Sequence, residues 1–194
     1  MAQLQPLPRD ELLKIKAFAA IAEIMGFVSN SLLTMGRKPE LLQAFSALNV
    51  QVFGPGRVDE RLKWLIGFVS SNAAGCRYCQ AHTSELAHGS GVAIDKIRAA
   101  FEYETSPLFN AAERAALRLA HHASLVPNLS TSEHFDDLKQ HYGEAEIVEI
   151  VAVIAMFGFL NRWNDTMGTQ LEPKPREFAS EILGAKGWIV GKHD

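Results

Sequence analysis

Gly75-Cys-Arg-Tyr-Cys-Gln-Ala-His-Thr83 holds both cysteines of this 194-residue chain, three positions apart. In a helix, a spacing of three places two side chains on roughly the same face, which brings the sulfurs within reach of a disulfide. His82 follows Cys79 by one further turn, so its imidazole can reach that sulfur. The stretch therefore predicts a helical dithiol with a base beside it.

The order in which the two thiols react follows from their positions on the helix. Free cysteine has a pKa of about 8.5, so a neighbouring group must lower it to give the reactive thiolate. Cys79 and His82 lie about 60° apart around the axis, and Cys76 and His82 about 120° apart. This favours Cys79 as the attacking thiol, Cys76 as its disulfide partner and His82 as the base. The reverse order of the cysteines stays open, because the helix dipole favours a thiolate at Cys76.

The predicted reaction is thiol-dependent reduction of a small organic hydroperoxide. A thiolate attacks the distal peroxide oxygen and becomes a sulfenic acid, with which the second thiol condenses to give a disulfide and water. An external dithiol then reduces the disulfide. The expected partners are the hydroperoxide and the dithiol reductant, and no metal or organic cofactor is expected.

Three simpler interpretations of the same residues compete with this one. Cys76 and Cys79 can be core residues without a redox role. Cys76, Cys79 and His82 can bind zinc with a fourth ligand from elsewhere, although structural zinc sites usually draw a second pair of ligands from another segment. His82 taken alone is typical of a helix surface.

Composition narrows the class of protein. A hydrophobic content of 47% is ample for a core, and a net charge of −3 with a pI near 6.2 gives no general attraction to nucleic acid or an anionic membrane. The longest apolar run, residues 150–160, is too short to span a bilayer, and the first residues do not resemble a secretory signal. The expectation is a cytoplasmic protein, where a Cys-x-x-Cys pair is typically redox-active or metal-binding.

Helical periodicity dominates the chain and no strand pattern competes with it. The sequence predicts a single all-α domain over residues 1–194, with an N-terminal helical extension at 1–55 and a core at 56–170. A capping box at Ser130–Glu133 is expected to precede one of the helices. Helices are predicted at 11–25, 29–35, 39–50, 59–74, 76–88, 93–101, 110–125, 135–142, 144–167 and 175–184.

The cysteine stretch resembles the signature of the carboxymuconolactone decarboxylase superfamily, in its alkylhydroperoxidase D-like branch. Residues 149–165 are similar to the last core helix of that superfamily, and residues 26–35 are similar to a segment of its longer peroxidase-related members. The resemblance implies a compact multi-helix fold, assembly into homo-oligomers (dimers, trimers or hexamers) and peroxidase activity at the Cys-x-x-Cys site.

Two positions depart from the family pattern. The family histidine lies four residues after the second cysteine, where this chain has Thr83, and His82 lies at a spacing of three. The family glutamate, twelve residues before the first cysteine, is replaced by Trp64. Glu60 lies one helical turn earlier on the same face and is the candidate substitute. Without that acid, the orientation of His82 and any proton relay would be weaker.

A polar cluster follows the apolar run of the last core helix. Asn161, Arg162, Asn164 and Asp165 can end the buried part of the helix, form a subunit interface or line the active-site cavity. Alternative functions are a decarboxylase-like lyase, which needs an acid/base pair rather than a disulfide, and a structural oligomer switched by the redox state of the cysteines.

Overall fold

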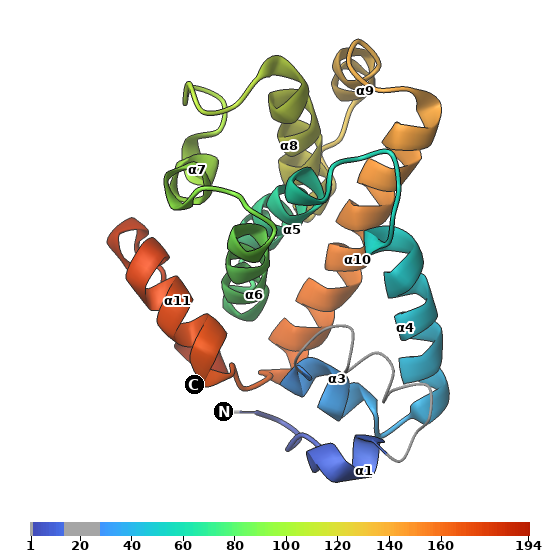
Figure 1. Cartoon of the computed structure of the whole chain (residues 1–194), viewed down its shortest axis with the longest axis vertical. Helices are drawn as coiled ribbons and strands as arrows, with labels where there is room; N and C mark the ends of the chain where they lie inside the picture. Colours follow the sequence, from blue (N-terminus) through green and yellow to red (C-terminus); the bar gives the residue numbers. More distant parts are fainter. Residues whose placement is uncertain (1, 14–27) are drawn as a thin grey trace.

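The computed structural model describes residues 2–13 and 28–194, and these residues form helices and loops without a β-strand. Figure 1 shows the helices gathered around α5. The α-helices are α1 (Arg9–Leu13), α3 (Asn30–Met35), α4 (Pro39–Phe53), α5 (Glu60–Ala73), α6 (Arg77–Gly89), α7 (Ile94–Ala99), α8 (Ala111–Ser124), α9 (Ser132–Leu138), α10 (Glu144–Met167) and α11 (Pro173–Leu183). Short 3-10 turns are η1 (Ala100–Glu102), η2 (Gly184–Lys186) and η3 (Gly191–His193).

The predicted all-α fold is confirmed, and most helix boundaries agree to within a few residues. The helix expected at 11–25 lies mainly outside the described residues, which include only its first turn as α1. The capping box before α9 was predicted at Ser130–Glu133, but the structure forms it one residue later, from Thr131 and His134. The Ser130 hydroxyl instead donates a hydrogen bond to Oδ1 of Asn128. Helix α11 begins at Pro173, two residues before the predicted start at Pro175, since Pro is readily accepted in the first helical turn.

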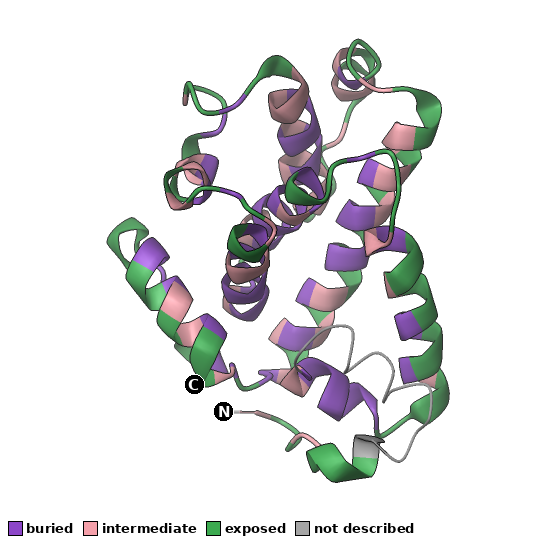
Figure 2. Ribbon diagram, in the orientation of Figure 1, coloured by how far each residue is buried: buried purple, intermediate pink, exposed green. Residues whose placement is uncertain are grey.

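Helix α5 lies at the centre of the core, where it packs against α6, α8 and α10. Figure 2 shows its ribbon buried along most of its length. Gly67 makes the crossing with α10 close, since a Cβ at this position would lie 2.2 Å from Cε2 of Phe157. The glycine therefore allows the Phe157 ring to lie directly against the α5 backbone.

A buried lysine joins α5 to α10. Lys63 is 2% exposed, and its Nζ donates to the carbonyl oxygens of Val52 (2.9 Å) and Gly54 (3.3 Å). The same Nζ lies 3.2 Å from Oε2 of Glu149. Glu149 also accepts hydrogen bonds from the backbone amides that precede α5. The buried ammonium thus has partners on all sides, as a buried charge requires.

The C-terminal segment returns across the start of α6. Helix α11 packs on α6, and Nε1 of Trp188 donates to the carbonyl of Arg77 at 3.3 Å. The amide of Leu171 donates to the carbonyl of His193 at 2.8 Å, which holds η3 against the end of α10. The last residues are thereby placed beside the cysteines.

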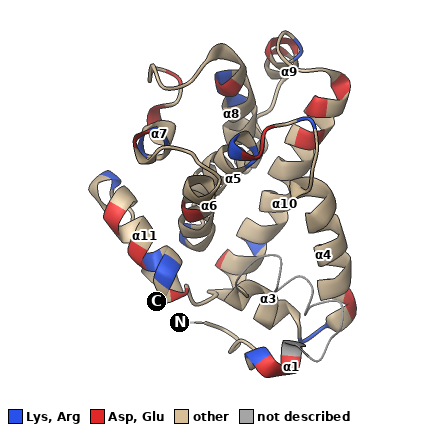
Figure 3. Ribbon diagram, viewed as in Figure 1, with Lys and Arg blue, Asp and Glu red and all other residues tan. Residues whose placement is uncertain are grey.

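The outer surface carries charges of both signs. In the view of Figure 3, acidic and basic residues are intermixed along α8 and α11, acidic residues gather at the start of α10, and α4 is largely uncharged. None of the described helices combines the length and the apolar character that crossing a membrane requires.

Candidate functional site

Gly75 and Cys76 form the turn that places the first sulfur. Gly75 has a φ of +75°, a left-handed conformation that glycine adopts without a steric cost. Cys76 follows as the N-cap of α6, with an extended backbone, and Cys79 lies in the first turn of the helix. Cys76 is 0% and Cys79 3% exposed, and both thiols are free. The predicted dithiol is thus assembled at a helix N-terminus inside the protein.

Cys76 lies among groups that favour its thiolate. A hydrogen bond from Cys79 is the main cause that lowers the pKa of Cys76, and the nearby imidazole of His193 adds to it. Burial opposes both, and the resulting pKa is about 6. Sγ of Cys76, a ring nitrogen of His193 and a carboxylate oxygen of Asp165 all lie within 4.8 Å of one another.

Cys79 has the opposite character. Burial raises the pKa of the Cys79 thiol, and the neighbouring Cys76 raises it further. Nδ2 of Asn164 donates to Sγ of Cys79 at 3.4 Å, which opposes the rise. The two sulfurs therefore divide into one that ionises readily and one that holds its proton.

His82, expected beside Cys79, makes a short contact with a carboxylate. Its Nε2 lies 2.7 Å from Oε2 of Glu172, which also accepts from the hydroxyl of Tyr78 at 3.0 Å and from the backbone amide of Asn30. Burial, the largest single influence, acts to raise the pKa of Glu172, but the hydrogen bond and charge of His82 together with backbone hydrogen bonds outweigh it, and the pKa is lowered. Since an ionised carboxylate only accepts, Nε2 of His82 carries a proton.

Glu60, the candidate for the family glutamate, lies on the first turn of α5. Its Oε1 accepts from Nε1 of Trp64 at 3.2 Å, and the Glu60 side chain is exposed. The Trp64 ring stacks on Phe53, with centroids 4.3 Å apart. The structure thus brings together Cys76 and Cys79, directs His82 to Glu172 and Glu60 to Trp64.

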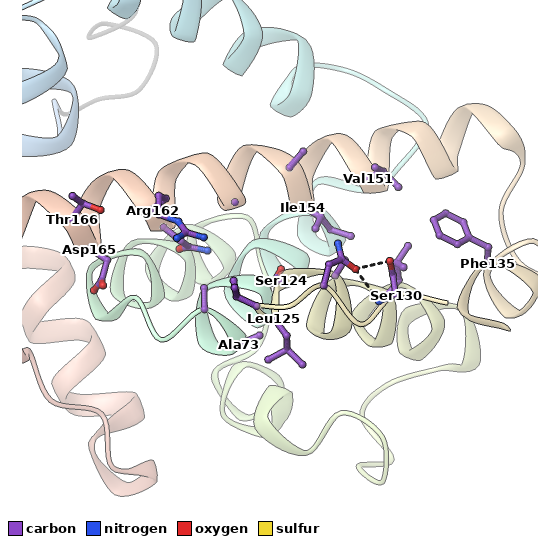
Figure 4. Close-up of a pocket in the computed structure, with 18 residues that line it drawn as sticks. Ala73, Ser124, Leu125, Ser130, Phe135, Val151, Ile154, Arg162, Asp165 and Thr166 are labelled. Atoms are coloured by element: carbon purple, nitrogen blue, oxygen red, sulfur yellow. Dashed lines mark hydrogen bonds between the residues drawn. The ribbon is translucent and has the colours of Figure 1, made fainter. Parts of the chain in front are cut away.

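A cavity of about 770 Å³ extends along α10. Figure 4 shows its residues spread from Phe135 and Val151 at one end to Asp165 and Thr166 at the other. Most of the lining is apolar. The charged groups, Arg162 and Asp165, lie with Asn161 and Thr166 at one end, called here the polar end, while Ser124, Asn128 and Ser130 add uncharged polar groups elsewhere. The volume is in the range of small-molecule sites. Because Asp165 also lies beside Cys76, the polar end of the cavity is next to the dithiol.

Among the residues that the structure describes, Cys76, Asp165 and His193 form a group whose donor atoms lie close enough together to bind a metal ion. Nζ of Lys192 binds Oδ2 of Asp165 at 2.8 Å, so a positive charge already occupies this carboxylate. That contact counts against a bound cation.

His193 and Glu172 were not identified from the sequence, since each is about 90 residues or more from the cysteines and belongs to no local motif. Asp165 was identified only as a member of the polar cluster.

The paired cysteines on a short helix within an all-helical core match a known family. A family model described as "Carboxymuconolactone decarboxylase family" matches residues 39–122. The debrominase Bmp8 is 42% identical to this chain, with a TM-score of 0.85 over 92% of this chain and 96% of Bmp8. This chain belongs to the carboxymuconolactone decarboxylase family.

Further proteins resemble this chain in sequence or fold. A cysteine-to-alanine variant of Bmp8, solved in complex with 2,3,4-tribromopyrrole, is 41% identical to this chain. The uncharacterized protein YdfG of Bacillus subtilis (strain 168) is 27% identical over 119 residues, which are 60% of this chain and 80% of YdfG. An uncharacterized peroxidase-related protein from Ralstonia eutropha JMP134, described as an alkylhydroperoxidase AhpD core, has a TM-score of 0.69 at 23% identity, covering 87% of this chain and 88% of that one. The fold is therefore that of the alkylhydroperoxidase D-like branch.

Proposed function

We propose that this protein is a dithiol-dependent reductase that removes a halogen from a small halogenated heteroaromatic ring. The observation that carries the proposal is the pair of reduced sulfurs next to the polar end of a largely apolar cavity. Such a cavity suits a flat, poorly hydrated ring, and the two thiols supply the two electrons that dehalogenation requires.

The reaction balances with these two thiols alone. The ring carbon that bears bromine accepts a proton, and the thiolate of Cys76 attacks the bromine. Bromine is transferred formally as Br⁺: an S–Br bond forms as the C–Br bond breaks, and the electron pair of that bond stays on the ring carbon. Cys79 then attacks Sγ of Cys76, bromide leaves, and the Cys76–Cys79 disulfide forms. The sum is one aryl bromide and two thiols converted to one arene, one disulfide and HBr. An external dithiol reduces the disulfide and completes the cycle.

We assign the first attack to Cys76, the order that sequence reasoning left open as the alternative. Cys76 caps the N-terminus of α6, where the dipole favours an anion, and Asp165 links it to the cavity. Both sulfurs are buried, and what distinguishes Cys79 is that burial and the neighbouring Cys76 disfavour its thiolate. Its attack on Cys76 is intramolecular and requires no access from the cavity.

The choice of substrate is supported by similarity to Bmp8, a debrominase, over nearly the whole of both chains. The bromopyrrole bound to the Bmp8 variant indicates the size and chemistry of the ligand to test first. Reduction of small hydroperoxides is the second candidate, favoured by the thiol of lowered pKa. It uses the same disulfide and differs in releasing an alcohol and water instead of bromide.

The test is a single turnover of the reduced protein without oxygen. Brominated pyrroles and tert-butyl hydroperoxide are supplied separately, and bromide, remaining hydroperoxide and disulfide are measured for wild type, Cys76→Ser and Cys79→Ser. We expect one bromide and one disulfide per chain in wild type, and no bromide from Cys76→Ser. His141→Gln, an exposed histidine variant, is the matched control. Hydroperoxide consumed without any bromide release would favour the second candidate, and bromide release by Cys76→Ser would reject the assigned order.

A further inference from the structure

His193 is a buried histidine that the family signature does not include. Its ring is 1% exposed, and Nδ1 lies 2.8 Å from the carbonyl oxygen of Thr169. A carbonyl oxygen only accepts, so Nδ1 carries a proton and the neutral ring has its lone pair on Nε2. The backbone of Thr169 thus fixes both the orientation and the tautomer of the ring, as outer partners do for functional histidines.

The imidazole of His193 lies near the first sulfur, in the same cluster as Asp165. Its Nε2 is sealed from solvent and has no hydrogen-bond partner in the described part of the chain. Oδ1 of Asp165 lies 3.7 Å from it, and Sγ of Cys76 belongs to the same cluster, within 4.8 Å. Three atoms that all offer lone pairs converge here, and the proton of the Cys76 thiol is the hydrogen they can share.

We propose that His193 is the base that takes the proton of the Cys76 thiol and returns it to the substrate. The identity of that substrate rests on the proposed function, whereas the proton transfer from Cys76 to His193 does not. The proton leaves Sγ for Nε2, giving a thiolate and an imidazolium beside the carboxylate of Asp165. After the sulfur takes the halogen, Nε2 gives the proton to the ring carbon and the imidazole is neutral again. For a hydroperoxide, the same proton would go to the departing alkoxide.

The other histidine near the site is positioned for a different contact. His82 directs Nε2 to Glu172, and the Tyr78 ring lies beside it, with centroids 4.6 Å apart. The centroid of the same Tyr78 ring lies 5.8 Å from that of His193, so this one ring is close to both imidazoles. The base is therefore supplied by the C-terminal segment, beyond the residues 39–122 that the family model matches.

The charges around the pair favour this transfer. Asp165 on α10 stabilises an imidazolium at His193, and the Lys192 ammonium on the other oxygen of Asp165 reduces that effect without removing it. From α6, Cys79 donates to the thiolate. The ion pair of Arg176 and Asp194 lies at the outer end of the same segment. The lowered pKa of Cys76 agrees with this arrangement.

The experiment follows the alkylation of Cys76 by iodoacetamide as a function of pH in the reduced protein. Trypsin cleaves after Arg77, so Cys76 and Cys79 fall in different peptides and mass spectrometry reads each thiol separately. We expect His193→Gln to raise the pH midpoint for Cys76 by at least one unit. At pH 5, below the midpoint of wild type, this makes the alkylation of Cys76 about tenfold slower, since one pKa unit is a factor of ten. His141→Gln should leave the profile of wild type unchanged.

A rescue measurement separates a chemical role from a structural one. His193→Ala leaves space for a small base, and we expect added imidazole to accelerate the alkylation of Cys76 in this variant and not in wild type. An unchanged midpoint in a folded His193→Gln, or the same alkylation rate in His193→Ala with and without imidazole, would overturn the proposal. Neither measurement uses a halogenated substrate, so the result stands apart from whether bromide is released.

Discussion

Glu172 is the residue at which three separate parts of the chain meet. One carboxylate accepts hydrogen bonds from the backbone of Asn30 at the start of α3 and from Tyr78 and His82 on α6. It also lies at the N-cap of α11, where the dipole favours its charge. The contacts that a single side chain makes here join the N-terminal part, the dithiol helix and the C-terminal helix.

We predict that Glu172→Gln lowers the free energy of unfolding at pH 7 by about 1–3 kcal/mol, because it leaves buried donors poorly satisfied. The pKa of Glu172 is lowered in the folded state. Its contribution is therefore present above the pKa of the unfolded carboxyl and is lost as the pH falls through the folded pKa. Urea unfolding at several pH values checks this. A difference between wild type and variant that grows on acidification would contradict it.

Glu60 offers a test of the acid expected from the family pattern. Its carboxylate is exposed and bound to Trp64, on the same helix. We predict that Glu60→Gln changes the rate of Cys76 alkylation at pH 6 by less than about twofold, as is usual for a surface substitution away from a site. A tenfold loss of rate would instead mean that Glu60 reaches the thiols in the reactive form.

The local part of the site could be predicted and the distant part could not. Cys76 and Cys79 were found because a spacing of three within one helix determines where two sulfurs lie. His193 approaches Cys76 only because the chain turns back after α10, and one histidine near the end of a sequence carries no pattern of its own. The contact of His82 with Glu172 likewise depends on how α11 packs on α6.

At the scale of elements, the close crossing of α5 and α10 depends on Gly67, which has no side chain. We predict that Gly67→Ala lowers stability by about 1–3 kcal/mol, since its Cβ would overlap the Phe157 ring and overpacking costs this much. Gly158→Ala is the matched control: it lies within α10, nothing lies within 4 Å of its Cβ, and we expect a gain of about 0.5–1 kcal/mol from helix propensity. Thermal unfolding of both variants measures the difference. Equal stabilities would argue against the close crossing.

Helix positions were predicted well where caps and apolar periodicity agree. Helix α10 begins and ends as expected, after Gly143 and before Gly168. Helix α9 was less well predicted because four adjacent polar residues offer several possible N-caps, of which the structure uses Thr131. The short segments that carry few core residues were therefore the hardest to place.

At the scale of the whole molecule, the C-terminal segment covers the site. Trp188 is 4% exposed and bonds to the first residue of α6. We predict that Trp188→Ala frees this segment, so that amide hydrogen exchange in residues 184–194 becomes faster and Cys76 is alkylated more readily at a pH where it is fully ionised. Ile189→Ala, at a neighbouring side chain that is 67% exposed, should change neither measurement. Unchanged exchange in Trp188→Ala would show that other contacts hold the segment.

The burial of both sulfurs has a consequence for the reductant. A disulfide between Cys76 and Cys79 would form behind η3 and the end of α10, with almost no surface of its own. A folded redox protein must bring its own thiol into contact with one of these sulfurs, and its bulk cannot enter a space that the C-terminal segment fills. Under the proposed cycle, regeneration by such a donor would require the segment to open widely, whereas a dithiol of a few atoms would need only a small opening. We therefore expect the enclosure to select for small electron donors.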